Sequence, residues 1–162
     1  VTICAIEKYC IGGGAALAAA CDFRIMAKSA TMRLPEIPLG MNMSWHAVPR
    51  LVALIGPARA KRFIIYGENI GADEAHGWGL ADDVVPDGEA LSAARALGEK
   101  TARLPPNAVR MSKQSVNAAA NALHHATTFM DLDQYALATT SEDYREAIKA
   151  FLEKRAPKFT GR

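Results

Sequence analysis

Residues 6–40 read IEKYCIGGGAALAAACDFRIMAKSATMRLPEIPLG, and the pattern of this stretch is the main indication of the fold. Ahead of it, residues 1–6 form an apolar, partly β-branched run that is typical of a strand buried on both faces. A loop is predicted over residues 7–12. The alanine-rich segment 13–21 predicts a helix, because alanine loses no side-chain freedom there and lets neighbouring backbone approach closely. Two further short strands are predicted at 22–27 and 30–34.

The rest of the chain is predicted to be mostly helical. Pro57 suits the first turn of a helix that Gly67 ends, and Pro105 with Pro106 breaks one helix and starts the next. Asp87 is predicted to cap the helix that follows it. The other predicted elements are a helix at 43–55, a helix at 73–78, a strand at 81–85 and a final helix from about Ser141 to Arg155.

Composition indicates one globular domain. The chain has 162 residues, 50% of them hydrophobic, and a net charge of +2 that gives no argument for nucleic acid as a partner. Cys4, Cys10 and Cys21 have no metal-ligand spacing and indicate reduced, buried thiols, which favours a cytoplasmic location. No apolar run is long enough to span a bilayer and the N-terminus lacks the order of a signal peptide, so we expect no membrane partner.

Three consecutive glycines, Gly12, Gly13 and Gly14, lie between the first strand and the helix. Glycines let backbone come close to a ligand, and the unpaired N–H groups of a helix N-terminus form a preset site for negative charge. A dinucleotide fingerprint would need glycine in place of Leu17, and a P-loop would need Lys-Ser or Lys-Thr at 15–16, so both nucleotide motifs fail. The alternative is a tight turn that only packs helix on strand.

Glu36 lies between two prolines in RLPEIPLG, beside Leu34, Ile37 and Leu39. A carboxylate in apolar surroundings can have a raised pKa and serve as a proton shuttle. An ordinary surface-turn glutamate gives the same local pattern, so spacing alone leaves both interpretations open.

The histidines give weaker signals. His46, next to Trp45, is a candidate acid or base, although a lone histidine in a mixed helix is more often structural. His124 and His125 are adjacent and point to different helix faces, so they cannot chelate one metal ion as a pair. We assign no metal site, and no serine or cysteine arrangement for nucleophilic catalysis stands out.

Together these motifs resemble the enoyl-CoA hydratase/isomerase (crotonase) family. The matching segments are residues 6–40, PRLVALIGPARAKRFIIYGENIGADEAHGWGLADDVVP at 49–86 and SEDYREAIKAFLEKRAPKF at 141–159. The resemblance implies an α/β, crotonase-like ββα spiral over 1–103, which is partial because the family's first spiral turns precede the segment that matches Val1. It implies that 104–162 form a C-terminal helical region that assembles homo-trimers or hexamers.

The resemblance also implies roles for site residues. Gly13 corresponds to the glycine whose N–H donates to the thioester oxygen, with Gly12 beside it at the substrate, and Glu36 corresponds to a catalytic glutamate. Family hydratases use a second glutamate, and Ala16 stands at its position. Family isomerases keep only the later glutamate, so the resemblance favours double-bond isomerisation of an acyl-CoA thioester. No cofactor is implied beyond the coenzyme A of the substrate.

One segment departs from the family pattern. MNMSWHAVPRL replaces the usual glycine-rich stretch and puts Ser44 and Trp45 near the acyl pocket. Lys154, with Arg155, is a candidate contact for the phosphates of CoA. Two alternative functions stay open: a catalytically incomplete member that binds acyl-CoA or assembles with other subunits, and a hydratase or lyase that recruits another second group, with His46 the nearest candidate.

Overall fold

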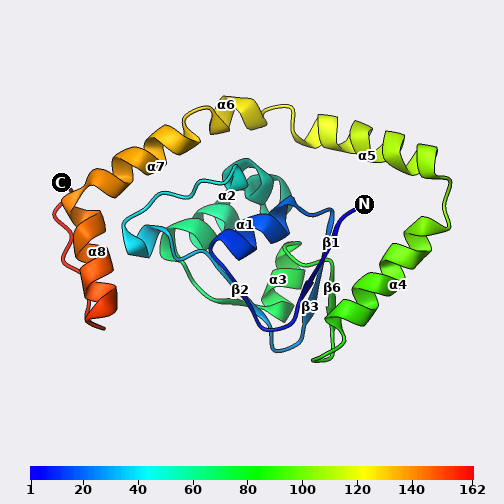
Figure 1. Cartoon of the computed structure of the whole chain (residues 1–162), viewed down its shortest axis with the longest axis horizontal. Coiled ribbons are helices and arrows are strands. Elements are labelled where there is room, and N and C mark those ends of the chain that lie inside the picture. The colour runs from blue at the N-terminus through cyan, green and yellow to red at the C-terminus, as the bar shows by residue number, and fades with distance from the viewer.

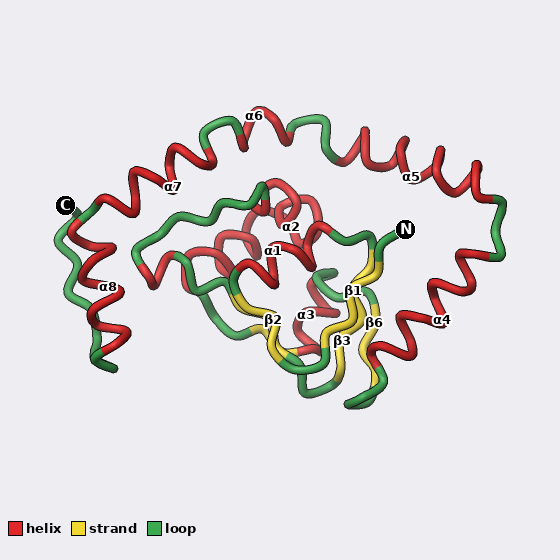
Figure 2. The backbone as a smooth tube through the Cα atoms, viewed as in Figure 1, coloured by secondary structure: helices red, strands yellow, loops and turns green.

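Six short strands form two small sheets, and helices cover them (Figures 1 and 2). The computed structural model describes residues 1–162. The strands are β1 (Ile3–Ile6), β2 (Tyr9–Ile11), β3 (Phe23–Ala27), β4 (Thr31–Arg33), β5 (Ile70–Gly71) and β6 (Asp83–Val85). The helices are α1 (Gly13–Ala20), α2 (Ala47–Tyr66), α3 (Ala72–Trp78), α4 (Ala90–Ala102), α5 (Pro106–Ala120), α6 (His124–Thr128), α7 (Asp131–Thr140) and α8 (Glu142–Leu152), with a 3-10 turn, η1, at Ile37–Leu39.

The strands β1 and β2 with the helix α1 form one ββα turn, and β3 and β4 begin the next. β1 pairs in parallel with β3, with Ile3 opposite Phe23, and β2 pairs in parallel with β4, with Tyr9 opposite Thr31. Parallel neighbours need a crossover connection, which α1 supplies for both pairs. β6 extends the first sheet in the order β1-β3-β6, and β5 completes the second in the order β2-β4-β5. The predicted ββα spiral is therefore confirmed.

Two strands are absent from the sequence-based prediction. The expected loop at 7–12 contains β2, so that expectation is wrong. Only Cys10 of this strand is buried, while Tyr9 and Ile11 are exposed, and one buried side chain gives no alternating pattern to read. β5 is shorter still, with two residues. Both segments are strands because they pair with β4.

Prolines and glycines set several helix limits as predicted. Gly67, with a φ of 58°, ends α2, and α5 begins at Pro106. α2 begins at Ala47, four residues later than predicted, and Gly56 interrupts it with a φ of 75° and a ψ of 164°. The helical segment that starts at Pro57 is thus distinct from the one before it, as its proline predicts.

The prediction that Asp87 caps α4 is wrong. Its Oδ1 atom accepts the N–H of Ser29 at 2.8 Å instead. The acceptor at the start of α4 is Glu7, whose carboxylate oxygens accept the N–H groups of Gly88 and Ala90, each at 2.9 Å. A residue from the β1–β2 connection therefore satisfies helix donors that the local sequence leaves unpaired.

A buried arginine ties β3 to the chain around it. Arg24 is 1% exposed, and its guanidinium donates to the carbonyl oxygens of Cys21 at 2.7 Å and Leu80 at 2.9 Å. It also pairs with the Asp82 carboxylate at 2.8 Å. Because a buried charge is tolerated only when it is paired and hydrogen-bonded, these contacts fix β3 against the start of β6. The surrounding core includes Ala18, Met26, Met32, Leu34, Leu51 and Phe63.

The three cysteines are free thiols. Cys10 is buried, and burial raises the pKa of its thiol to about 12, which keeps it protonated. Cys4 and Cys21 are half-buried beside the first sheet. The prediction of three buried thiols is therefore confirmed for Cys10 and wrong for Cys4 and Cys21, which are only partly buried.

α4 packs on β1 and β3, and from α5 onward the chain runs as an arch around the core (Figure 1). The predicted domain boundary between residues 103 and 104 falls between α4 and α5. α5 has no buried residue, and an apolar groove of about 810 Å³ lies between it, α2 and the end of α1. α8 returns to the core and packs against η1. None of the helices combines the length and apolar character that crossing a membrane requires.

The contact between α8 and the turn after η1 predicts a strong glycine requirement at Gly40. A Cβ on Gly40 would lie 2.7 Å from the Tyr144 Cα atom, and its φ is 75°. We expect Gly40→Ala to lower the free energy of unfolding by about 2 to 4 kcal/mol, from overpacking and left-handed strain together. Gly88→Ala is the matched control, since its φ is 85° but nothing lies within 4 Å, and it should cost about 1 kcal/mol. Urea unfolding compares the two, and equal losses would contradict the packing argument.

Candidate functional site

The glycine loop opens α1 with a backbone conformation that suits glycine. Gly12 has a φ of 57°, and its N–H donates to the Arg33 carbonyl oxygen at 2.9 Å. Its own carbonyl oxygen accepts the Ala16 N–H at 3.0 Å, which is the first hydrogen bond of α1. The N–H groups of Gly13 and Gly14 precede that bond and have no acceptor within the helix. Unpaired N–H groups at a helix N-terminus favour negative charge, which is the property on which the predicted anion site rests.

The turn that carries Glu36 is held by backbone contacts. The Glu36 carbonyl oxygen accepts the N–H groups of Leu39 at 3.0 Å and Met41 at 2.9 Å. Gly67, at the end of α2, packs against this turn so closely that a Cβ there would lie 2.9 Å from the Leu34 carbonyl oxygen. The Glu36 side chain therefore projects from a turn that has little freedom to move.

The Glu36 side chain lies against the glycine loop. Its Oε1 atom is 3.1 Å from the position that a Cβ on Gly12 would take, so a side chain there would crowd the carboxylate. Its Oε2 atom is buried and has no hydrogen-bond partner. Burial raises the pKa of Glu36 above its ordinary value, with a smaller opposing effect from a backbone hydrogen bond. A carboxyl group with a raised pKa holds a proton to a higher pH than an exposed one, which favours its use in proton transfer.

Trp45 covers the other side of the loop. Its six-membered ring lies 3.3 Å from the position that a Cβ on Gly13 would take. Trp45 and His46 both have left-handed φ angles, which cost on the order of 1 to 3 kcal/mol each for residues with side chains. Ser44 is half-buried, and its carbonyl oxygen accepts the Ala47 N–H at 3.2 Å. The carboxylate and the indole thus meet the same helix N-terminus.

Ala16 and Lys154 are the remaining predicted site residues. Ala16 is 3% exposed and belongs to the apolar core, one turn into α1. Lys154 is exposed beyond the C-terminal end of α8, while the N-terminal end of that helix packs at Gly40. Eleven helical residues separate the two ends, roughly 16 Å at 1.5 Å per residue.

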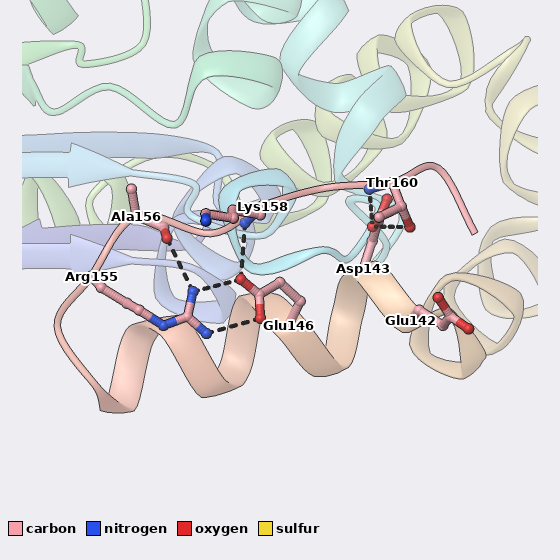
Figure 3. Close-up of a pocket in the computed structure, with 7 residues that line it drawn as sticks. All are labelled: Glu142, Asp143, Glu146, Arg155, Ala156, Lys158 and Thr160. Carbon is pink, nitrogen blue, oxygen red and sulfur yellow. Dashed lines mark hydrogen bonds and ion pairs between the residues drawn. The ribbon is translucent and has the colours of Figure 1, made fainter.

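Arg155, the second candidate for CoA phosphates, is already paired. Its guanidinium donates to both carboxylate oxygens of Glu146, at 2.6 and 2.9 Å (Figure 3). The hollow drawn there is lined mainly by charged residues. Asp143, one of them, accepts the backbone N–H groups of Thr160 and Gly161, at 2.6 and 2.8 Å. These carboxylates fasten the C-terminal tail to α8, so the hollow is a structural junction.

Asp131 is a functional candidate that the sequence analysis missed. Its carboxylate is 7% exposed and accepts the His46 N–H at 2.8 Å. The two residues are 85 positions apart, and no local pattern marks the aspartate. Only the docking of α7 on the start of α2 brings them together.

The arrangement pairs backbone N–H donors with one carboxyl group of raised pKa. Such donors stabilise negative charge that develops on a substrate oxygen, and the carboxyl group can move a proton beside it. A ββα spiral with this site at the N-terminus of its small-residue helix defines the crotonase fold.

Comparison with known proteins agrees with this assignment. The profile described as enoyl-CoA hydratase/isomerase matches residues 1–162. A probable enoyl-CoA hydratase of Mycobacterium bovis is 37% identical over 161 residues, 99% of this chain and 63% of that protein. A 1,2-epoxyphenylacetyl-CoA isomerase of Escherichia coli is 34% identical over 160 residues, 99% of this chain and 61% of that protein. The crystal structure of a carnitinyl-CoA hydratase of Mycobacterium avium has a TM-score of 0.92 at 33% identity, with 99% of this chain and 62% of that one covered.

The chain therefore belongs to the enoyl-CoA hydratase/isomerase family. It spans about 63% of the length of the curated relatives that match it first.

The raised pKa of Glu36 predicts a pH-dependent stability difference between the parent protein and Glu36→Gln. A native pKa above the ordinary 4.5 means that the folded state binds this proton more tightly than the unfolded state. The contribution of Glu36 to stability is therefore fully present below pH 4.5 and is lost as pH rises through the native pKa. The variant lacks this loss, so its stability relative to the parent should rise with pH across that window and then level off. Urea unfolding from pH 4 to 8 measures the difference, and a flat difference would contradict the burial argument.

Proposed function

We propose that this chain carries the proton-transfer part of an acyl-CoA active site and that its reaction is the migration of a carbon–carbon double bond. The observation that carries the proposal is the position of Glu36, a carboxylate with one unpartnered oxygen packed against the glycine loop that opens α1. Family membership supports the substrate class, because the relatives compared above are named for CoA thioesters.

In the proposed reaction, the Gly13 N–H donates to the thioester carbonyl oxygen. Glu36 takes a proton from C2 of a 3-enoyl-CoA, and the electron pair of that C–H bond moves into conjugation with the thioester. The N–H donor stabilises the resulting dienolate, and removing one such donor typically costs ~100 to 1000-fold in rate. The same carboxyl group delivers the proton to C4, which leaves the double bond between C2 and C3. The coenzyme A carried by the substrate is the only cofactor in this scheme.

Ala16 supports isomerisation over hydration. Addition of water needs a second group that holds and deprotonates the water molecule, and the methyl group of Ala16 can do neither. Isomerisation needs one carboxyl group, because the same proton moves between two carbons of one substrate. Lys154, exposed and without an ion pair, is the cation we propose for the phosphates of CoA.

Hydration is the second candidate function. The first relatives that match this chain are named hydratases, including a crotonyl-CoA hydratase of Syntrophomonas wolfei that is 34% identical. His46 is exposed and follows Trp45, so its imidazole is the group that we propose for a second proton transfer in that case.

Product analysis of Ala16→Glu and Glu36→Gln separates these two functions. The parent protein should convert 3-enoyl-CoA to 2-enoyl-CoA and hydrate it poorly, and Glu36→Gln should lose ~100 to 10,000-fold in turnover. Ala16→Glu should produce measurable 3-hydroxyacyl-CoA at a lower melting temperature, since a larger polar side chain enters the core. Chromatography of the CoA products makes the comparison.

Strong hydration by the parent would refute isomerisation and favour the His46 scheme, which His46→Gln then tests.

We also propose that the arch assembles copies of the chain into a trimer or a pair of trimers. Large apolar side chains on the arch are more than half exposed, and oligomers bury such surfaces between subunits. They are Met111, Val116, Leu123, Phe129, Leu132, Leu137, Phe151 and Leu152.

Sedimentation velocity at micromolar concentration tests this assembly. The parent protein should sediment as a trimer or hexamer, and Leu132→Asp with Leu137→Asp should shift it toward monomer, because buried charges without partners disfavour an interface. Leu91→Asp is the control, since Leu91 is 52% exposed but lies on α4, before the arch helices that carry the patch. A well-folded parent monomer would count against the proposal.

A further inference from the structure

Trp45 and His46 form a backbone feature that the proposed proton transfer does not use. Their φ angles are 64° and 53°, so two consecutive residues with side chains are left-handed. Sterics make this conformation rare outside glycine, and it persists only where surrounding contacts hold it. The question is which contact does so.

One side chain from the arch contacts this pair. Asp131 Oδ2 accepts the His46 N–H at 2.8 Å, and Asp131 is 7% exposed at the first position of α7. His46 is the N-cap residue of α2, and its own side chain makes no capping hydrogen bond. The Asp131 carboxylate therefore supplies the acceptor and the negative charge that a helix N-terminus favours.

Two further polar groups at this junction come from α2 and α6. Arg50, on α2, donates to the His46 carbonyl oxygen at 2.7 Å. His124, on α6, has a buried Nε2 atom without a partner. The arch thus meets the core where the left-handed pair lies, and the backbone of His46 is hydrogen-bonded on both its N–H and its carbonyl side.

The backbone at this pair decides where the Trp45 ring lies. Trp45 is 65% exposed, so burial does not fix its side chain. Its ring nevertheless lies 3.3 Å from the position of a Cβ on Gly13, the residue whose N–H we propose as the thioester donor. A change in either φ angle would therefore change where the indole lies relative to α1.

We propose that Asp131 is a positioning residue, whose hydrogen bond to the His46 amide holds the Trp45 indole over Gly13 and thereby limits the acyl group admitted beside the N-terminus of α1. The position of the indole is a property of the folded chain and does not depend on any substrate. The limit on the acyl group rests on the proposed function.

The unmodified protein provides the first test. The His46 amide should exchange its proton slowly by NMR, because a buried carboxylate accepts it. Exchange as fast as that of an unprotected amide would overturn the proposal. Because this test uses the unmodified protein, the proposal stays testable even if Asp131 variants fail to fold.

Fluorescence provides the second test. Trp78, which packs beside Arg59 and Arg62, is the other tryptophan, and Trp78→Phe leaves Trp45 as the sole emitter. In that background Asp131→Ala should shift the emission to longer wavelength and raise quenching by acrylamide, while Asp131→Asn, which keeps an acceptor oxygen, should restore most of the parent signal. Asp133→Ala removes an exposed carboxylate from the same helix and should change neither. Equal signals from the two alanine variants would overturn the proposal.

Calorimetry with acetyl-CoA, butyryl-CoA and octanoyl-CoA tests the limit on the acyl group. Asp131→Ala should raise the affinity for the long acyl chain relative to the short one by about tenfold, the discrimination that one methylene group can supply, and Asp133→Ala should leave the ratio unchanged. An unchanged ratio in Asp131→Ala would overturn the limit on the acyl group. Absence of binding by every protein, the parent included, would refute the proposed function and with it this limit, while the fluorescence result would still decide the placement of Trp45.

Discussion

The site depends on the hydrogen bond from the Gly12 N–H to the Arg33 carbonyl oxygen. It continues the parallel pairing of β2 and β4 by one step beyond Ile11, which lies opposite Arg33. Because parallel strands run in the same direction, the segments that follow them leave the sheet at the same edge. One segment is the glycine loop with α1 and the other is the turn with Glu36. The carboxylate therefore meets the helix N-terminus as a consequence of strand direction.

Small residues then decide how close the two segments come. Gly12 leaves space for the Glu36 carboxylate, Gly67 lets the end of α2 approach the turn, and Gly40 lets α8 approach it from the other side. Each contact lies at a distance that a Cβ would prevent or strain. A turn fixed by two close backbone contacts, at Gly67 and Gly40, holds its carboxylate against Gly12 with little reorganisation, which is the condition for efficient proton transfer.

Local chemistry made several features predictable. Pro106 starts α5 because its missing N–H is not needed in a first turn, and Ser141 caps α8 by accepting the Tyr144 N–H at 3.0 Å. The same reasoning was wrong for Asp87, because its carboxylate binds Ser29 and Glu7 caps α4 from a distance. Local signals identify what a helix end needs, and the fold decides which side chain supplies it.

The sequence alone indicates the order of the elements apart from β2 and β5, the glycine loop, and Glu36 with alanine at position 16. Tertiary packing places Glu36 against Gly12, where burial raises the pKa of its carboxyl group. It also places Trp45 over Gly13 and brings the Asp131 carboxylate to the His46 amide. These two sets of features depend on interactions of different range along the chain. Backbone preferences and caps act within a few residues, whereas the distance between groups far apart in the chain is set by strand pairing and packing, which no local pattern encodes.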